Sequence, residues 1–116
     1  MENKQIIVGI THGDINSIGY EVIIKCLLDN NIFDIFVPVV YGSPKVAAYH
    51  RKVLNIENFS FNSIRDPGEA NNKRANIINC LGDDVRVELG KSTSHSGETA
   101  FIALERAVND LKEGKI

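Results

Sequence analysis

The sequence has little charge imbalance and no long apolar run. Its 116 residues carry 13 Lys and Arg against 15 Asp and Glu, a formal net charge of −2. Nucleic acids and anionic membranes attract proteins through a basic excess, so we expect neither as a partner. No apolar run approaches the roughly 20 residues of a membrane-spanning helix, and the N-terminus lacks the form of a secretory signal. We therefore expect a cytoplasmic protein.

Cysteine and histidine are too few and too scattered to form a metal site. Cys26 and Cys80 lie far apart without a CxxC pattern, and their apolar neighbours predict buried thiols rather than a disulfide or a metal pair. His12, His50 and His95 are also far apart, and no two have the spacing of metal ligands. The polar neighbours of His50 predict a solvated or boundary position. We expect no metal to be bound by this chain alone.

The common nucleotide-binding motifs are also missing. Gly9 and Gly13 are four residues apart rather than two, so they do not begin a dinucleotide fingerprint. Gly19 is followed by Tyr20 instead of the lysine of a phosphate-binding P-loop. The residues that contact a nucleotide cofactor, if there is one, therefore cannot be identified from these motifs.

Apolar patterning predicts strands that alternate with helices. The continuous β-branched run 6–10 predicts a strand covered on both faces of a parallel sheet. Further strands are predicted at 36–41, 59–64 and 76–81, with a short strand or extended segment at 85–89. Helices are predicted from about Gly19 to Leu28, from Pro44 to about Leu54, and from the 90–97 loop to the residues before Gly114. This order predicts one layered α/β unit without an internal domain boundary, built on a largely parallel sheet flanked by helices.

Several local features can be predicted more sharply. Pro38 lacks an N–H, so it should lie at a sheet edge or at the start of its strand. Ser43 should cap a helix that has Pro44 in its first position. In the last helix, Ser94 or Ser96 should be the cap. The predicted inward-facing residues of that helix are Ala100, Leu104, Ala107, Val108 and Leu111. The chain stops where an α/β fold would next form a strand, so we expect an incomplete fold.

The polar turn 11–19 is the first candidate for a functional site. It joins a predicted strand to a helix N-terminus, where free backbone N–H groups attract anions. His12, Asp14, Asn16 and Ser17 are its candidate site-lining side chains, and His95 is a further candidate at the start of the last helix. The alternative is purely structural: Asp14 and Asn16 bond their own turn, His12 packs beneath it, and His95 belongs to a capping loop. No catalytic residue is expected within the chain.

These residues also carry a family resemblance. Ile10-Thr-His-Gly-Asp14, followed by Ile18-Gly19 and Glu21, resembles the N-terminal signature of 4-hydroxythreonine-4-phosphate dehydrogenase, the pyridoxal phosphate biosynthetic protein PdxA. Val40-Tyr-Gly42 and the segment from Gly90 to Gly114 are similar to later parts of the family. The family's Pro-Ala-Gly is Ile15-Asn16-Ser17 here, and its second Pro is Tyr20. The resemblance covers the whole chain but only the first third of a family member.

The resemblance implies a fold like that of isocitrate and isopropylmalate dehydrogenases. It also implies an NAD-dependent oxidation and decarboxylation of 4-phosphooxy-threonine in vitamin B6 biosynthesis, with a divalent metal held by histidines across a homodimer. Those histidines belong to regions outside this chain, so the fragment should be inactive and should bind neither cofactor. Two alternatives remain: a related dehydrogenase of phosphorylated four-carbon hydroxy acids, and a small non-enzymatic module that binds a phosphorylated metabolite.

Overall fold

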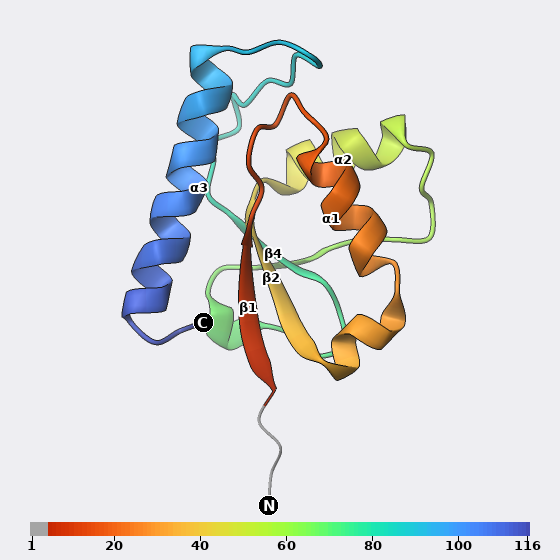
Figure 1. Ribbon diagram of the computed structural model, residues 1–116, viewed down its shortest axis with the longest axis vertical. Helices are drawn as coiled ribbons and strands as arrows, with labels where there is room; N and C mark the ends of the chain where they lie inside the picture. Colours follow the sequence, from red (N-terminus) through yellow and green to blue (C-terminus); the bar gives the residue numbers. More distant parts are fainter. Residues whose placement is uncertain (1–4) are drawn as a thin grey trace, which may run out of the picture.

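The computed structural model describes residues 5–116, which form a four-stranded sheet (Figure 1). The strands are β1 (Ile6–Thr11), β2 (Phe36–Gly42), β3 (Asn62–Ile64) and β4 (Asn76–Asn79). Their order across the sheet is β1-β2-β4-β3, and every neighbouring pair is parallel. The predicted α/β class and parallel sheet are confirmed. All four strands therefore present their carboxyl ends at the same edge, the upper one in Figure 1.

Helices cover both faces of this sheet. On one face, α1 (Gly19–Leu27) and α2 (Pro44–Val53) pack with Val40 and Ile77, and on the other α3 (Ser94–Lys112) packs with Val39 and Ile78. The two clusters alternate along β2 because successive side chains of a strand point to opposite faces. Two short 3₁₀ helices, η1 (Asn30–Asp34) and η2 (Pro67–Glu69), complete the connections. The result is a three-layer α/β/α arrangement (Figure 1).

The predicted start of α2 is confirmed, whereas two predicted strands are shorter than expected. The Ser43 side chain accepts a hydrogen bond from the Val46 N–H, and Pro44 is the first helical residue. In contrast, β3 contains three residues instead of the predicted six. β4 ends at Asn79 instead of the predicted residue 81. The 85–89 segment, predicted as a short strand or extended segment, pairs with no strand among the described residues.

The positions of β1 and Pro38 differ from the predictions. β1 lies at the sheet edge and is half-buried along most of its length rather than covered on both faces. Pro38 is the third residue of an interior strand. It is tolerated because β2 first pairs with β4 at Val39, one residue later. The Pro38 carbonyl accepts a hydrogen bond from the Asn76 side chain at 3.1 Å, so its acceptor is satisfied by a side chain rather than by the ladder.

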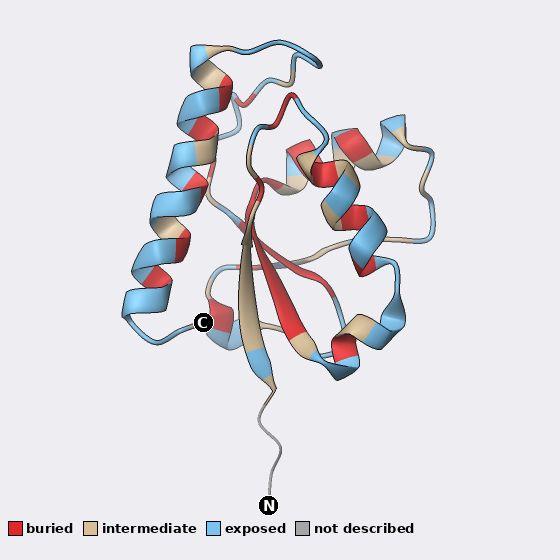
Figure 2. Ribbon diagram, viewed as in Figure 1, coloured by how far each residue is buried: buried red, intermediate tan, exposed pale blue. Residues whose placement is uncertain are grey.

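The prediction for α3 was wrong about its cap and about most of its buried face, in which only Ala107 was correctly placed. The cap is Thr93, whose hydroxyl accepts a hydrogen bond from the Ser96 N–H at 3.0 Å. Leu104, Val108 and Leu111 are exposed, and exposed positions run along the whole length of α3 (Figure 2). The buried residues are Ser96, Thr99, Ala103, Ala107 and Asp110. This face is rotated by roughly a quarter turn from the predicted stripe, at 100° per residue. Hydrophobic periodicity could not show this, because polar partners in the sheet set the helix rotation.

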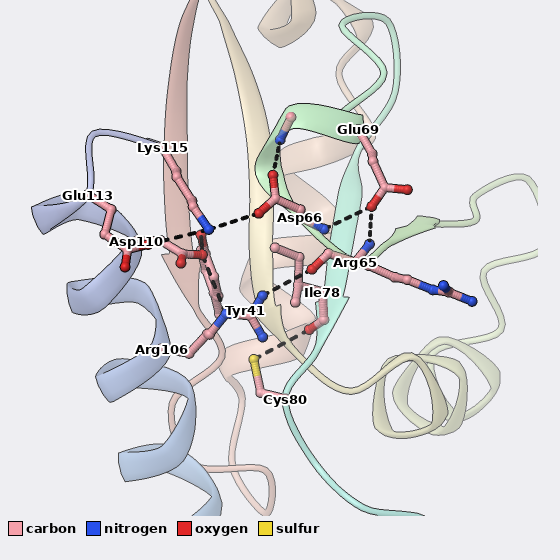
Figure 3. A network of polar contacts seen from close by, with 11 residues as sticks. Tyr41, Arg65, Asp66, Glu69, Ile78, Cys80, Arg106, Asp110, Glu113 and Lys115 are labelled. Atoms are coloured by element: carbon pink, nitrogen blue, oxygen red, sulfur yellow. Dashed lines mark hydrogen bonds and ion pairs between the residues drawn. The ribbon is translucent and has the colours of Figure 1, made fainter.

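One of those polar partners is Tyr41 of β2 (Figure 3). Its hydroxyl donates a hydrogen bond to the buried carboxylate of Asp110 at 2.7 Å, and Arg106 Nε lies 3.5 Å from the same carboxylate oxygen. Burial of the phenol and its bond to Asp110 raise the pKa of Tyr41. After the helix, Lys115 pairs with Asp66 at 3.1 Å. These contacts fix α3 to β2 and to the cap of η2.

The cysteine prediction was half wrong. Cys26 is exposed on α1, whereas Cys80 is half-buried after β4. Burial raises the pKa of the Cys80 thiol to about 11, so it is not a nucleophile at neutral pH.

Within residues 5–116, no helix is both long and apolar enough to cross a bilayer.

The Tyr41–Asp110 hydrogen bond gives a first testable prediction. Tyr41→Phe leaves a buried carboxylate without its neutral donor, so the free energy of unfolding should fall by about 2 kcal/mol. Tyr49→Phe is the matched control because Tyr49 is 41% exposed, and its effect should stay within about 0.5 kcal/mol. Urea unfolding of both variants measures the difference. Equal effects would contradict the assigned role of Tyr41.

Candidate functional site

Two loops meet at the carboxyl edge of the sheet. The turn 12–18 joins β1 to α1, and the loop 80–93 joins β4 to α3 (Figure 1). Backbone and side-chain hydrogen bonds connect the two loops between Asn16 and residues 88–91. In open α/β sheets, ligands bind outside the carboxyl ends of the strands. This pair of loops is therefore the candidate site.

His12 lies beneath the turn and is 1% exposed. Its Nδ1 is 2.8 Å from the Tyr20 hydroxyl, and its Nε2 is 3.0 Å from the Thr99 carbonyl oxygen. Because a carbonyl can only accept, Nε2 carries the proton and Nδ1 accepts from Tyr20. The Tyr20 oxygen in turn accepts a hydrogen bond from the Ser43 N–H at 3.0 Å. This chain of bonds joins β1, α1, the cap of α2 and the start of α3.

Burial keeps this chain of bonds neutral. It lowers the pKa of His12 below the ordinary value of 6.5, and the Thr99 carbonyl offsets only part of that shift. Burial also raises the pKa of Tyr20, which therefore remains protonated. In these neutral forms, both ring nitrogens of His12 and the hydroxyl of Tyr20 have hydrogen-bond partners. The arrangement is that of a satisfied structural network.

Gly42 makes room for the network. A Cβ atom at this position would collide with the Tyr20 hydroxyl and lie 2.9 Å from His12 Nδ1. Gly19 has a similar role, because a Cβ there would approach the His12 carbonyl oxygen to 2.6 Å. Both glycines are therefore required by close approach.

His50 is buried, contrary to the predicted solvated or boundary position. It is 4% exposed, and its Nε2 donates to the carbonyl of Ile15 at 2.8 Å. Its ring stacks on Tyr20 with centroids 5.3 Å apart and an interplanar angle of 16°. His50 thus holds the first turn from α2. Sequence reasoning missed it because its neighbours in the chain are polar.

The four candidate side chains of the turn divide into two pairs. His12 and Asn16 are buried, whereas Asp14 and Ser17 are exposed. Asp14 accepts a hydrogen bond from the Asn16 N–H at 2.9 Å, and its carbonyl accepts one from the Ser17 N–H at 3.1 Å. Asp14 therefore shapes the turn and still presents a carboxylate to solvent.

His95 lies in the first turn of α3 and is half-buried. Its Nε2 accepts a hydrogen bond from the Arg86 N–H at 3.1 Å, so Nδ1 carries the proton of the neutral ring. The structure places His95 at the same edge of the sheet as the turn, at the start of the helix that follows the other loop. Tyr20 and Thr99 were not predicted as site residues. A buried tyrosine in the apolar stripe of α1 was the available signal, because its hydroxyl requires a partner.

Residues 5–116 do not form a metal centre by themselves. Among residues 5–116, no three His, Cys, Asp or Glu side chains lie close enough to hold a metal ion. The Nε2 atoms of His12, His50 and His95 are all engaged in hydrogen bonds to the backbone. No step of a reaction can therefore be assigned to a metal bound by these residues.

Comparison with known proteins identifies the family. Residues 34–116 match the family of the pyridoxal phosphate biosynthetic protein PdxA. The chain belongs to this family. It is 45% identical over 116 residues to 4-hydroxythreonine-4-phosphate dehydrogenase of Bacteroides thetaiotaomicron, covering 100% of the chain and 32% of that protein. It is 32% identical to a putative D-threonate 4-phosphate dehydrogenase of Oceanobacillus iheyensis, covering 98% of the chain and 35% of that protein.

Solved structures show the same fold. A 4-hydroxythreonine-4-phosphate dehydrogenase from Burkholderia phymatum superimposes with a TM-score of 0.86 at 26% identity, over 98% of the chain and 35% of that structure. One from Klebsiella pneumoniae gives 0.79 at 25% identity, over 97% and 35%. The PdxA-family chain thus spans about a third of the length of these relatives.

Asp14 provides a test of the turn. Asp14→Ala removes the acceptor for the Asn16 N–H, so the free energy of unfolding should fall by about 1 kcal/mol. Asp14→Asn keeps an acceptor oxygen and should lose less. Urea unfolding measures both variants. If turnover of the full-length protein instead drops sharply while stability is unchanged, Asp14 contacts a ligand.

The buried His12 predicts a pH dependence of stability. Its pKa is lower in the folded than in the unfolded chain, so the unfolded state binds more protons below about pH 6.5. The contribution of neutral His12 is fully present above that pH and is lost as the pH falls through the folded pKa. Urea unfolding between pH 8 and pH 5 should show the decline. His12→Gln should flatten it, and His95→Gln should preserve it; the reverse pattern would contradict this assignment.

Proposed function

We propose that this chain is the N-terminal part of an NAD-dependent, metal-assisted 4-hydroxythreonine-4-phosphate dehydrogenase. The enzyme would oxidise and decarboxylate 4-phosphooxy-threonine in pyridoxal 5'-phosphate biosynthesis, as a cytoplasmic homodimer. The single observation that supports this most strongly is the 45% identity over the whole chain to the Bacteroides thetaiotaomicron enzyme. The parallel sheet, with its loops gathered at the carboxyl edge, is consistent with a small phosphorylated substrate at that edge.

Within that enzyme, the chain would supply scaffold and rim rather than catalytic groups. Asn16 holds the two loops together, and His12 holds α3 through Thr99. Asp14 and Ser17 are exposed on the turn, and His95 lies in the first turn of α3. The divalent metal would be bound by residues outside this chain, because those described here do not form a metal site. The family resemblance implies the same for the main NAD contacts. We therefore propose that the chain has no turnover by itself.

A related substrate is the second candidate. The relatives named as putative D-threonate 4-phosphate dehydrogenases are 32% and 28% identical to this chain. D-threonate 4-phosphate carries a hydroxyl where 4-phosphooxy-threonine carries an amino group. The discrimination between the two would rest on one or two polar contacts, whose loss changes specificity strongly when they are buried.

Steady-state kinetics of the full-length protein tests both candidates. NADH formation with a divalent metal present should give a higher kcat/KM for 4-phosphooxy-threonine than for D-threonate 4-phosphate. The opposite preference would assign the related function. The 116-residue chain serves as the control and should form no NADH. If neither substrate is oxidised but this chain alone binds one of them in calorimetry, it is a non-enzymatic binding module.

A further inference from the structure

The Asn16 side chain connects the two loops of the candidate site. Asn16 is 3% exposed. Its Oδ1 accepts a hydrogen bond from the Glu88 N–H at 2.7 Å, and its Nδ2 donates to the Lys91 carbonyl at 2.9 Å. Its main-chain carbonyl also accepts from the Gly90 N–H at 2.9 Å. We propose that Asn16 is a positioning residue that sets the 88–91 turn against the 12–18 turn, so that both form the rim of the substrate site.

The chemistry of an amide is required at this position. The 88–91 segment is a tight turn in which the Lys91 N–H donates to the Glu88 carbonyl at 3.1 Å, and Gly90 has a φ of +77°. The Glu88 N–H, a donor, and the Lys91 carbonyl, an acceptor, have no partner within the turn itself. A planar side-chain amide satisfies both at once. A carboxylate of the same shape accepts from the Glu88 N–H but repels the Lys91 carbonyl.

The position of this turn affects more than its own four residues. Thr93, two residues after Lys91, caps α3 through its hydroxyl. The 12–18 turn also holds α3 through His12, whose Nε2 donates to the Thr99 carbonyl at 3.0 Å. Asn16 and His12 therefore fix the loop and the helix start to β1 with two separate contacts. A shift of the 88–91 turn would move that side of the rim relative to the other.

The outward faces of the two turns suit a phosphorylated substrate. Ser17 is exposed on the first turn, and Lys91 and Ser92 are exposed beside the second. A lysine ammonium and two hydroxyls can neutralise and hydrogen-bond a phosphate, provided the loops stay at a fixed separation. The Asn16 amide, buried between the loops, fixes that separation. This inference rests on the proposed function, because it assumes that the substrate lies at this edge.

Asn76 provides a matched control. It is fully buried at the amino end of β4, and its Nδ2 donates to the carbonyls of Pro38, Asn71 and Arg74 at 3.0–3.1 Å. Asn76 and the two loops of the rim therefore lie at opposite ends of the sheet. The Oδ1 of Asn76 also accepts hydrogen bonds from Asn62 Nδ2 and the Asn71 N–H. Asn76→Asp thus replaces a buried amide that has more hydrogen bonds than Asn16, at a place where no substrate is expected.

The experiment compares Asn16→Asp and Asn76→Asp in the full-length protein. With 4-phosphooxy-threonine at pH 8, Asn16→Asp should raise KM by up to roughly tenfold, with a smaller change in kcat. Tenfold is the limit reached if substrate binding must recover the whole free energy of the lost Asn16–Lys91 hydrogen bond. Burial and the facing Lys91 carbonyl both raise the pKa of the new carboxyl group, so at pH 5.5 more of it is protonated and can donate, and KM should return toward the wild-type value measured at that pH. Asn76→Asp should lower the melting temperature but leave KM unchanged at both pH values.

Each outcome decides the proposal. If Asn16→Asp lowers only the melting temperature, or if both variants raise KM equally, Asn16 is not a positioning residue. If Asn16→Asp does not fold, Asn16→Ser, which keeps one hydroxyl donor, should show a smaller rise in KM. If the wild-type protein oxidises neither substrate, the proposed function fails. Hydrogen exchange then decides the connection itself: Asn16→Ala removes the side-chain acceptor of the Glu88 N–H, so the Glu88 amide should exchange faster in Asn16→Ala than in Asn76→Ala, and equal rates would overturn it.

Discussion

The fold depends on a buried chain of hydrogen bonds that begins at the Ser43 N–H and ends at the Thr99 carbonyl. Tyr20 and His12 lie between them, and each bond joins a different element. Ser43 caps α2, Tyr20 belongs to α1, His12 follows β1, and Thr99 belongs to α3. Buried polar groups are costly unless every one is paired. The four elements therefore have one relative arrangement in which all of these groups are satisfied, and apolar packing alone would allow several.

Much of the architecture could be predicted because it depends on local rules. The β-branched run of β1, the Ser43 cap with Pro44 after it and the alternation of strands with helices are all properties of short segments. The rotation of α3 is a property of distant residues. Asp110 turns inward because Tyr41 of β2 donates to it, so the leucines that periodicity placed in the core are exposed. The position of Pro38 was predicted wrongly for a similar reason. The residue at which β2 begins to pair with β4 depends on β4, which is distant in the sequence.

The candidate site was predictable in position but not in the direction of its side chains. The turn after β1 was identified from its polar residues and its place before a helix, and the structure places it beside the loop that leads to α3. Nothing in the sequence separates His12 and Asn16, which point inward, from Asp14 and Ser17, which point outward. That division follows from partners 72 to 87 residues away in the chain. His50 shows the same limit, because its acceptor is a main-chain carbonyl of the turn.

The close approach at Gly42 links two positions that are far apart in the sequence. The space that a side chain would fill at residue 42 is occupied by the phenolic oxygen of residue 20 and the imidazole of residue 12. A methyl group at position 42 becomes compatible only when that oxygen is lost, and losing the oxygen also unpairs the imidazole and the Ser43 amide. A substitution of Gly42 therefore requires a compensating change at Tyr20. Gly42 is thus required by the hydroxyl of Tyr20 in α1, a relation that the sequence alone does not show.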